Sequence, residues 1–153
     1  MILRILTAAA VAVGLSGSAF AQTISLGTNP QGSLAYAVGA AVSKIAIDHA
    51  GLQMRVVPQG GPNVVVPLVN NGELEFSIAN GVAASFAYTG RGEFNKPNKN
   101  IRAVAMLVDL YSGFVVSQGS DIHSLKDLKG KRVASGFLTQ QAVQTDAEAV
   151  LNT

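Results

Sequence analysis

The sequence predicts an α/β fold with a mostly parallel sheet, and two observations support this expectation. Short segments rich in strand-forming residues are each followed by a glycine-containing turn and then by a segment with helical periodicity. Strands that alternate with helices through short connections form parallel sheets. Apolar residues make up 48% of the 153 residues, which is enough for a buried core and argues against disorder.

The first strand–helix unit is the most regular. Residues 23–26 alternate polar and apolar side chains and predict a strand, and residues 27–33 form a turn rich in glycine and proline. Apolar residues from Leu34 onward recur at the spacing of one helix face, with Ser33 as a suitable N-cap. Gly51 is expected to end this helix in a left-handed conformation.

The second unit contains an ambiguous segment. Residues 54–57 predict a strand, and a glycine-rich turn follows at residues 58–63. Residues 64–71 have the β-branched side chains of a strand but the context of a short helix, and Pro67 would disturb a helix interior. We expect a short helix with this proline early in it.

The remaining elements become shorter toward the C-terminus. Residues 73–79 predict a third strand and residues 81–88 an alanine-rich helix, followed by a polar surface loop at residues 91–100. Further expected elements are strands at residues 101–107, 114–116 and 132–135, a helical turn at residues 124–128 opened by Ser124, and a helix from Gln140 onward.

The N-terminus has the three parts of a secretory signal peptide. Arg4 supplies positive charge, residues 5–15 form an apolar run, and Ala19 and Ala21 frame a small-residue cleavage site. A membrane anchor is the alternative, but this run is too short to cross a hydrocarbon core of about 30 Å. We therefore expect residues 1–21 to be removed after Ala21 and the remaining chain to be periplasmic.

The composition argues against several functional classes. Charged residues are only 13% of the chain, with 11 basic and 9 acidic, so the clustered basic face of a nucleic-acid-binding protein is not expected. The absence of cysteine removes thiol nucleophiles and zinc–thiolate sites, and two histidines leave little for acid–base or metal chemistry. We expect no enzymatic activity, no cofactor and no metal site.

Three glycine-containing connections, at residues 27–33, 59–63 and 136–139, are the candidate binding elements. In open α/β sheets, ligands bind beyond the carboxyl ends of the strands, where helix N-termini offer unpaired N–H groups to a carboxylate or phosphate. The first connection resembles a phosphate-binding loop but lacks its lysine, which argues against nucleotide hydrolysis. Any one connection is more simply interpreted as a plain turn, but three of them with polar, uncharged linings favour a binding site.

Neutral side chains and glycine amides in and beside these connections could hold a small polar molecule. Tyr36 could face the ligand or be half-buried packing, and Asn80 is included because it follows a predicted strand. The expected ligand contacts are Thr28, Asn29, Gly32, Ser33, Tyr36, Gly60, Gly61, Asn63, Asn80 and Thr139.

Three stretches of the chain carry a family resemblance. They read ISLGTNPQGSLAYAVGAAVSKI, VVPQGGPNVVVPLVNNGELEFSIANGVAASFAYTG and IHSLKDLKGKRVASG. Together they resemble the TAXI family of TRAP-transporter solute-binding proteins. The matching positions are Gly27, Thr28, Gly32, Ser33 and Tyr36 in the first stretch, and Gly60, Gly61, Asn63 and residues 71–78 in the second.

The resemblance implies a type II periplasmic-binding-protein fold with two lobes and mostly parallel sheets, truncated in the second lobe. Residues 22–107 would supply the N-terminal part of lobe I, and residues 108–153 would begin lobe II. The implied function is an extracytoplasmic receptor that closes over a small anionic solute, such as glutamate or a dicarboxylate. It would deliver this solute to the membrane permease subunits of a TRAP transporter.

Two other functions stay open on the same fold. A secreted enzyme would need a nucleophile–base pair or a metal cluster, which this composition makes difficult to assemble. A ligand-sensing module would bind a solute in the same way but report its presence instead of delivering it.

Overall fold

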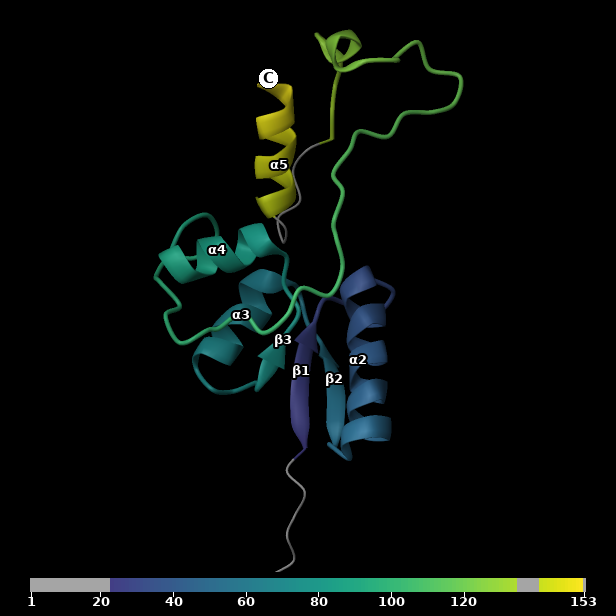
Figure 1. The fold of residues 1–153 in the computed structure, drawn as a ribbon. Coiled ribbons are helices and arrows are strands. Elements are labelled where there is room, and N and C mark those ends of the chain that lie inside the picture. The colour runs from purple at the N-terminus through teal and green to yellow at the C-terminus, as the bar shows by residue number, and fades with distance from the viewer. Residues whose placement is uncertain (1–22, 135–140, 153) are drawn as a thin grey trace, which may run out of the picture.

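The computed structural model describes residues 23–134 and 141–152, which form a small α/β fold around a parallel three-stranded sheet (Figure 1). Strand β1 (Ile24–Thr28) is central and pairs in parallel with β2 (Met54–Pro58) and with β3 (Phe76–Ser77). The predicted α/β class and parallel sheet are confirmed. The described residues form one sheet, and a second lobe is not shown.

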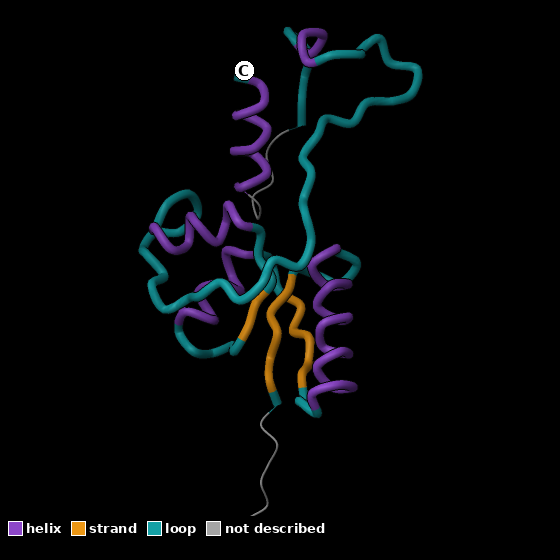
Figure 2. Tube along the Cα trace, viewed as in Figure 1, coloured by secondary structure: helices purple, strands orange, loops and turns teal. Residues whose placement is uncertain are grey.

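Each strand leads into a helix. Strand β1 is followed by α2 (Leu34–Ala50), β2 by α3 (Pro62–Asn70) and β3 by α4 (Gly81–Thr89). Because the three strands are parallel, all three helices begin at the same edge of the sheet (Figures 1 and 2). None of the helices in the described part of the chain is long and apolar enough to cross a membrane.

The helix boundaries follow from local chemistry. The Ser33 hydroxyl accepts a hydrogen bond from the Tyr36 amide at 3.2 Å, and Gly51 ends α2 with φ 64°, as predicted. The ambiguous segment is helical as predicted, but α3 already begins at Pro62, so Pro67 lies in its interior and not early in the helix as expected. Proline has no amide hydrogen, so this position cannot donate to the Asn63 carbonyl one turn earlier.

The two faces of β1 pack against different helices. Side chains alternate along a strand, so Leu26 and Thr28 share one face and Gly27 lies on the other. A Cβ at Gly39 of α2 would lie 2.7 Å from Thr28 Cγ2, and one at Gly27 would lie 3.0 Å from Val65 Cγ1 of α3. Helices therefore approach β1 closely from both sides.

The hydrophobic core lies on the α3 side of the sheet. Its fully or largely buried members are Val65, Val66, Leu74, Ala87 and Phe94, with Val57, Leu68 and Phe86 packed around them. This cluster joins α3 and α4 to the sheet and to the loop that follows α4. It includes Phe94, a residue of the loop expected on the surface.

The third strand is shorter than predicted. We expected residues 73–79, but β3 contains only Phe76 and Ser77. The amides of residues 73 and 74 bond instead to the Leu68 carbonyl at the end of α3. The Glu75 carboxylate accepts a hydrogen bond from the Ser25 amide at 2.8 Å. In a longer β3 this amide would instead donate to a backbone carbonyl of the neighbouring strand.

The strands expected at residues 101–107 and 114–116 are absent, and residues 132–134 of the third expected strand are also not in a strand. The first two segments are apolar but exposed: Met106 is 85% exposed and Val115 97%. Their composition favours a strand, but a strand also needs a hydrogen-bonded neighbour. Among the described strands none pairs with them, and Ser135 lies outside the described residues.

Two short helices follow this extended segment. The predicted turn at Ser124 is a 3₁₀ helix, η1 (Leu125–Leu128), and the last element is α5 (Gln141–Leu151), which contacts α4. The Asp127 carboxylate accepts the amides of His123 and Ser124 at 3.0 and 2.8 Å. These bonds stabilise the ionised form and hold the pKa of Asp127 below its usual value.

The close approach of α2 to β1 predicts an unusual outcome for the substitution Gly39→Ala. Alanine normally stabilises a helix relative to glycine by up to about 1 kcal/mol. Here the added methyl would meet Thr28 Cγ2 at 2.7 Å, so overpacking should lower the free energy of unfolding by about 1–3 kcal/mol. Urea denaturation measures the change.

The matched control is Gly81→Ala in α4, where a Cβ meets nothing within 4 Å. This variant should be neutral or slightly stabilising. Equal effects of the two substitutions would contradict the packing proposed for Gly39.

Candidate functional site

The three strand-to-helix connections meet at the carboxyl edge of the sheet. The Gln59 amide donates to the Thr28 carbonyl at 2.9 Å, and the Ile78 amide donates to the Gly27 carbonyl at 2.9 Å. These bonds hold the ends of β2 and β3 beside the end of β1. The predicted contact residues of the first two glycine-containing connections are therefore brought to the same edge as Asn80, while Thr139 and the third connection at residues 136–139 lie outside the described residues.

The β1–α2 connection contributes both buried and accessible groups. Thr28 is fully buried and its hydroxyl donates to the Asn29 carbonyl at 3.0 Å. The Asn29 Oδ1 atom is shielded from solvent and has no hydrogen-bond partner in the described structure. Gly32 is exposed with φ 86°, whereas Ser33 caps α2 and Tyr36 is half-buried in its first turn.

The β2–α3 connection leaves a helix N-terminus without a side-chain cap. Gly60 is exposed and Gly61, with φ 134°, is the buried N-cap of α3. No side chain bonds to the first amides of this helix, and Pro62 has none to offer. The side-chain oxygen of Asn63 is shielded and unpaired, like that of Asn29.

The β3–α4 connection is closed by Asn80. Its Oδ1 atom accepts the Ala83 amide at 2.8 Å and caps α4. This residue therefore has a structural role, and only its side-chain amide nitrogen is left for a ligand.

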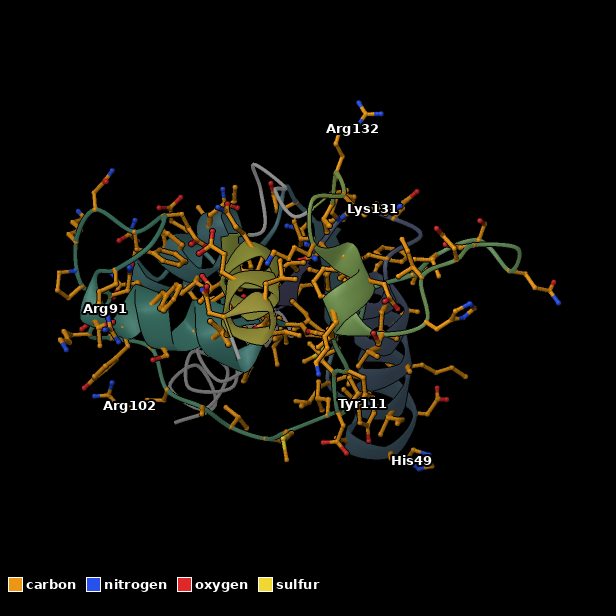
Figure 3. All side chains as sticks on the ribbon, turned by 90° about the horizontal axis from the view of Figure 1, so that it is seen from above. His49, Arg91, Arg102, Tyr111, Lys131 and Arg132 are labelled. Carbon is orange, nitrogen blue, oxygen red and sulfur yellow. The ribbon has the colours of Figure 1, made fainter. Side chains whose placement is uncertain are left out.

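The electrostatics of this edge favour a negative ligand. Helix N-termini carry partial positive charge, and the first turns of α2, α3 and α4 contain no acidic residue. In the view from above, in which α5 and η1 are drawn over the sheet, the labelled His49, Arg91, Arg102 and Arg132 lie toward the periphery (Figure 3). The attraction for an anion at the edge thus comes from backbone amides, with neutral side chains around them.

A pocket of about 350 Å³ lies between α3 and the loop that follows α4. It is lined by Asn63, Pro67, Glu93, Phe94, Asn95, Lys96 and Asn98. Of these, only Asn63 was expected to bind a ligand. The sequence pattern placed residues 91–100 in a surface loop, and Phe94 within that polar run was the one signal of burial.

Glu93 is the chemically unusual member of this pocket. Both carboxylate oxygens are shielded from solvent and have no hydrogen-bond partner in the described part of the chain. Asn98 is buried, and its side-chain amide donates to the carbonyls of Ala87 and Lys96 at 3.2 Å each. Across residues 23–134 and 141–152, no group of three or more His, Cys, Asp or Glu side chains could hold a metal ion.

The capping bond of Asn80 leads to a prediction for two substitutions. Asn80→Ala removes the acceptor of the Ala83 amide and should lower the free energy of unfolding by about 1 kcal/mol. Asn80→Asp keeps an oxygen acceptor and should retain most of the stability. Urea denaturation compares the two, and an equal loss in both variants would show that the cap is not what Asn80 contributes.

Comparison with known proteins identifies the family. The model of the NMT1-like family matches residues 26–152, a range that contains β2, β3, most of β1 and the three glycine-containing connections predicted from the sequence. No curated protein matches the chain. Because the match covers most of the chain, this protein belongs to the NMT1-like family, a family of the periplasmic-binding-protein type.

Proposed function

We propose that this protein is an extracytoplasmic solute receptor of the TAXI type. It binds a small carboxylate, such as glutamate or a dicarboxylate, and delivers it to the permease subunits of a TRAP transporter. Membership of the NMT1-like family supports a solute-binding role. The carboxylate and the transporter type are inferred from the motifs at residues 27–36 and 60–78 and from the geometry of the sheet edge.

The observation that supports a carboxylate ligand is the shared edge of the sheet at which α2, α3 and α4 begin. Each N-terminus contributes roughly 0.3–1 kcal/mol toward a nearby negative charge. The first turn of α3 is the strongest candidate because no side chain caps it. The Val64 and Val65 amides already donate to the Gly61 carbonyl at 3.0 Å, so the Asn63 amide is the first-turn donor that a carboxylate at this position would use.

Receptor function also requires a conformational change. We propose that residues 22–107 form part of one lobe, that residues 108–153 begin a second, and that the solute stabilises a closed arrangement. A solute shifts this equilibrium only by its difference in affinity for the two states. Binding without covalent chemistry fits a site whose predicted contacts are hydroxyl groups, amide side chains and glycine amides.

The proposed location depends on the N-terminal segment. Expression of the full chain in a bacterial host should yield a periplasmic product that begins at Gln22. Fractionation followed by intact-mass measurement tests this, with an Ala21→Arg variant at the small-residue position as a control that should block cleavage. A cytoplasmic product that retains Met1 would contradict the location.

A thermal-shift screen tests the solute class directly. Glutamate and dicarboxylates at about 100 times their dissociation constant should stabilise the native state by about 2.7 kcal/mol. Neutral compounds of matched size, such as the corresponding diamides, should give no shift. Failure of every carboxylate at millimolar concentration would count against this ligand class.

A pair of variants at Gly32 tests whether the anion binds near this residue. This glycine is exposed and has open space around it, and both Asn and Asp tolerate positive φ better than other residues. Gly32→Asp should weaken carboxylate binding by about tenfold through repulsion, while Gly32→Asn, which has the same shape, should not. Equal affinity in the two variants would place the anion away from the β1–α2 connection.

A further inference from the structure

We propose that the pocket between α3 and residues 93–98, called here the α3–loop pocket, binds a small organic cation with a primary ammonium group on an apolar body. The binding groups are the Glu93 carboxylate and the Asn63 side-chain oxygen. This site goes beyond the carboxylate receptor proposed above. It contains none of the other expected solute contacts.

The first argument is the set of unpaired acceptors in this pocket. Three shielded side-chain oxygens, two of Glu93 and one of Asn63, have no partner in the described residues. A buried polar group without a hydrogen bond is costly, and a buried carboxylate is costlier still. Such groups are rare in folded proteins and mark places where a partner is expected.

The nearby cations do not neutralise Glu93. The Arg91 guanidinium lies over the Phe86 ring at 5.8 Å and donates to the Thr89 hydroxyl at 3.3 Å. The Lys99 ammonium lies over the Tyr88 ring at 3.9 Å. Lys96 also lines the pocket, but it is exposed and forms no ion pair with Glu93 in the described part of the chain.

The α3 backbone adds a further acceptor. Pro67 lines the pocket together with Asn63, and its missing amide hydrogen leaves the Asn63 carbonyl without its usual partner in the helix. The proline inside α3 therefore changes the hydrogen bonding on the side of the pocket that α3 forms. The side-chain oxygen of Asn63 is unpaired, and its carbonyl lacks the amide donor that a helix normally supplies four residues later.

The size and lining of the pocket select the class of cation. A volume of about 350 Å³ is in the range of small-molecule sites. The side chains of Pro67 and Phe94 provide apolar surface for a short hydrocarbon body. A primary ammonium has three N–H donors, which matches the three unpaired side-chain oxygens in number. Because those oxygens are shielded, binding requires Glu93 to turn toward the pocket it lines.

The test uses n-butylammonium as the probe and amide NMR of the full chain as the measurement. For a ligand with five non-hydrogen atoms we expect a dissociation constant of about 1 mM. Shifts should concentrate at residues 63–68 and 93–98. Tetramethylammonium, which has charge but no N–H donor, should bind at least tenfold more weakly. Saturation by millimolar Ca²⁺ that excludes the amine would overturn the proposal in favour of a metal site.

The variant Glu93→Gln separates binding from folding. It should weaken n-butylammonium binding at least tenfold and raise the thermal midpoint by a few degrees, because it removes an unpaired charge without changing the shape. Glu73→Gln makes the same change at an exposed carboxylate and should alter neither quantity. Unchanged amine affinity in Glu93→Gln, or shifts outside the α3–loop pocket, would refute the site. Neither result would overturn the carboxylate receptor, which does not use Glu93 as a ligand contact.

Discussion

The close packing of helices on both faces of β1 is the constraint on which the rest of the described structure depends. Glycine at position 27 admits α3 to one face of the strand, and glycine at position 39 admits α2 to the other. At both positions a methyl group would occupy the space in which helix and strand meet. The two glycines therefore let both helices pack closely on the single central strand. With the helices in these positions, β2 and β3 can pair with β1 on either side in parallel.

The candidate site is a consequence of that parallel arrangement. The three parallel strands end at one edge of the sheet, so the N-termini of three helices lie there. The strand arrangement alone brings these N-termini together, and no charged side chain is needed. Low charge in the sequence and an anion-attracting edge are therefore compatible. Two of the helices are capped by their own side chains, Ser33 and Asn80, which leaves α3 as the helix whose first amides have no side-chain acceptor.

The features that the sequence predicted well are those decided by neighbours in the chain. Ser33 as an N-cap and Gly51 as a left-handed end depend only on adjacent residues, and both are present in the structure. Residues 101–107 have the composition of a strand, but a strand exists only beside a partner whose position depends on the whole fold. Non-local pairing is what the residue pattern cannot supply.

Glu93 shows the same limit within the candidate sites. A glutamate in a polar run between a glycine and an asparagine-rich stretch is expected to be solvated. Burial of its carboxylate results from Phe94 joining the core and from Asn98 bonding to the end of α4. These contacts fold the loop against α3, and they link residues that the sequence keeps well apart.

Asn63 is the point at which the two proposed sites meet. It stands in the first turn of α3, where an anion would be held, and its side chain lines the pocket that contains Glu93. A carboxylate at the sheet edge would be opposed by the charge of Glu93, and a cation in the α3–loop pocket would cancel that charge. Filling one site should therefore strengthen binding at the other, and by linkage the effect is equal in both directions.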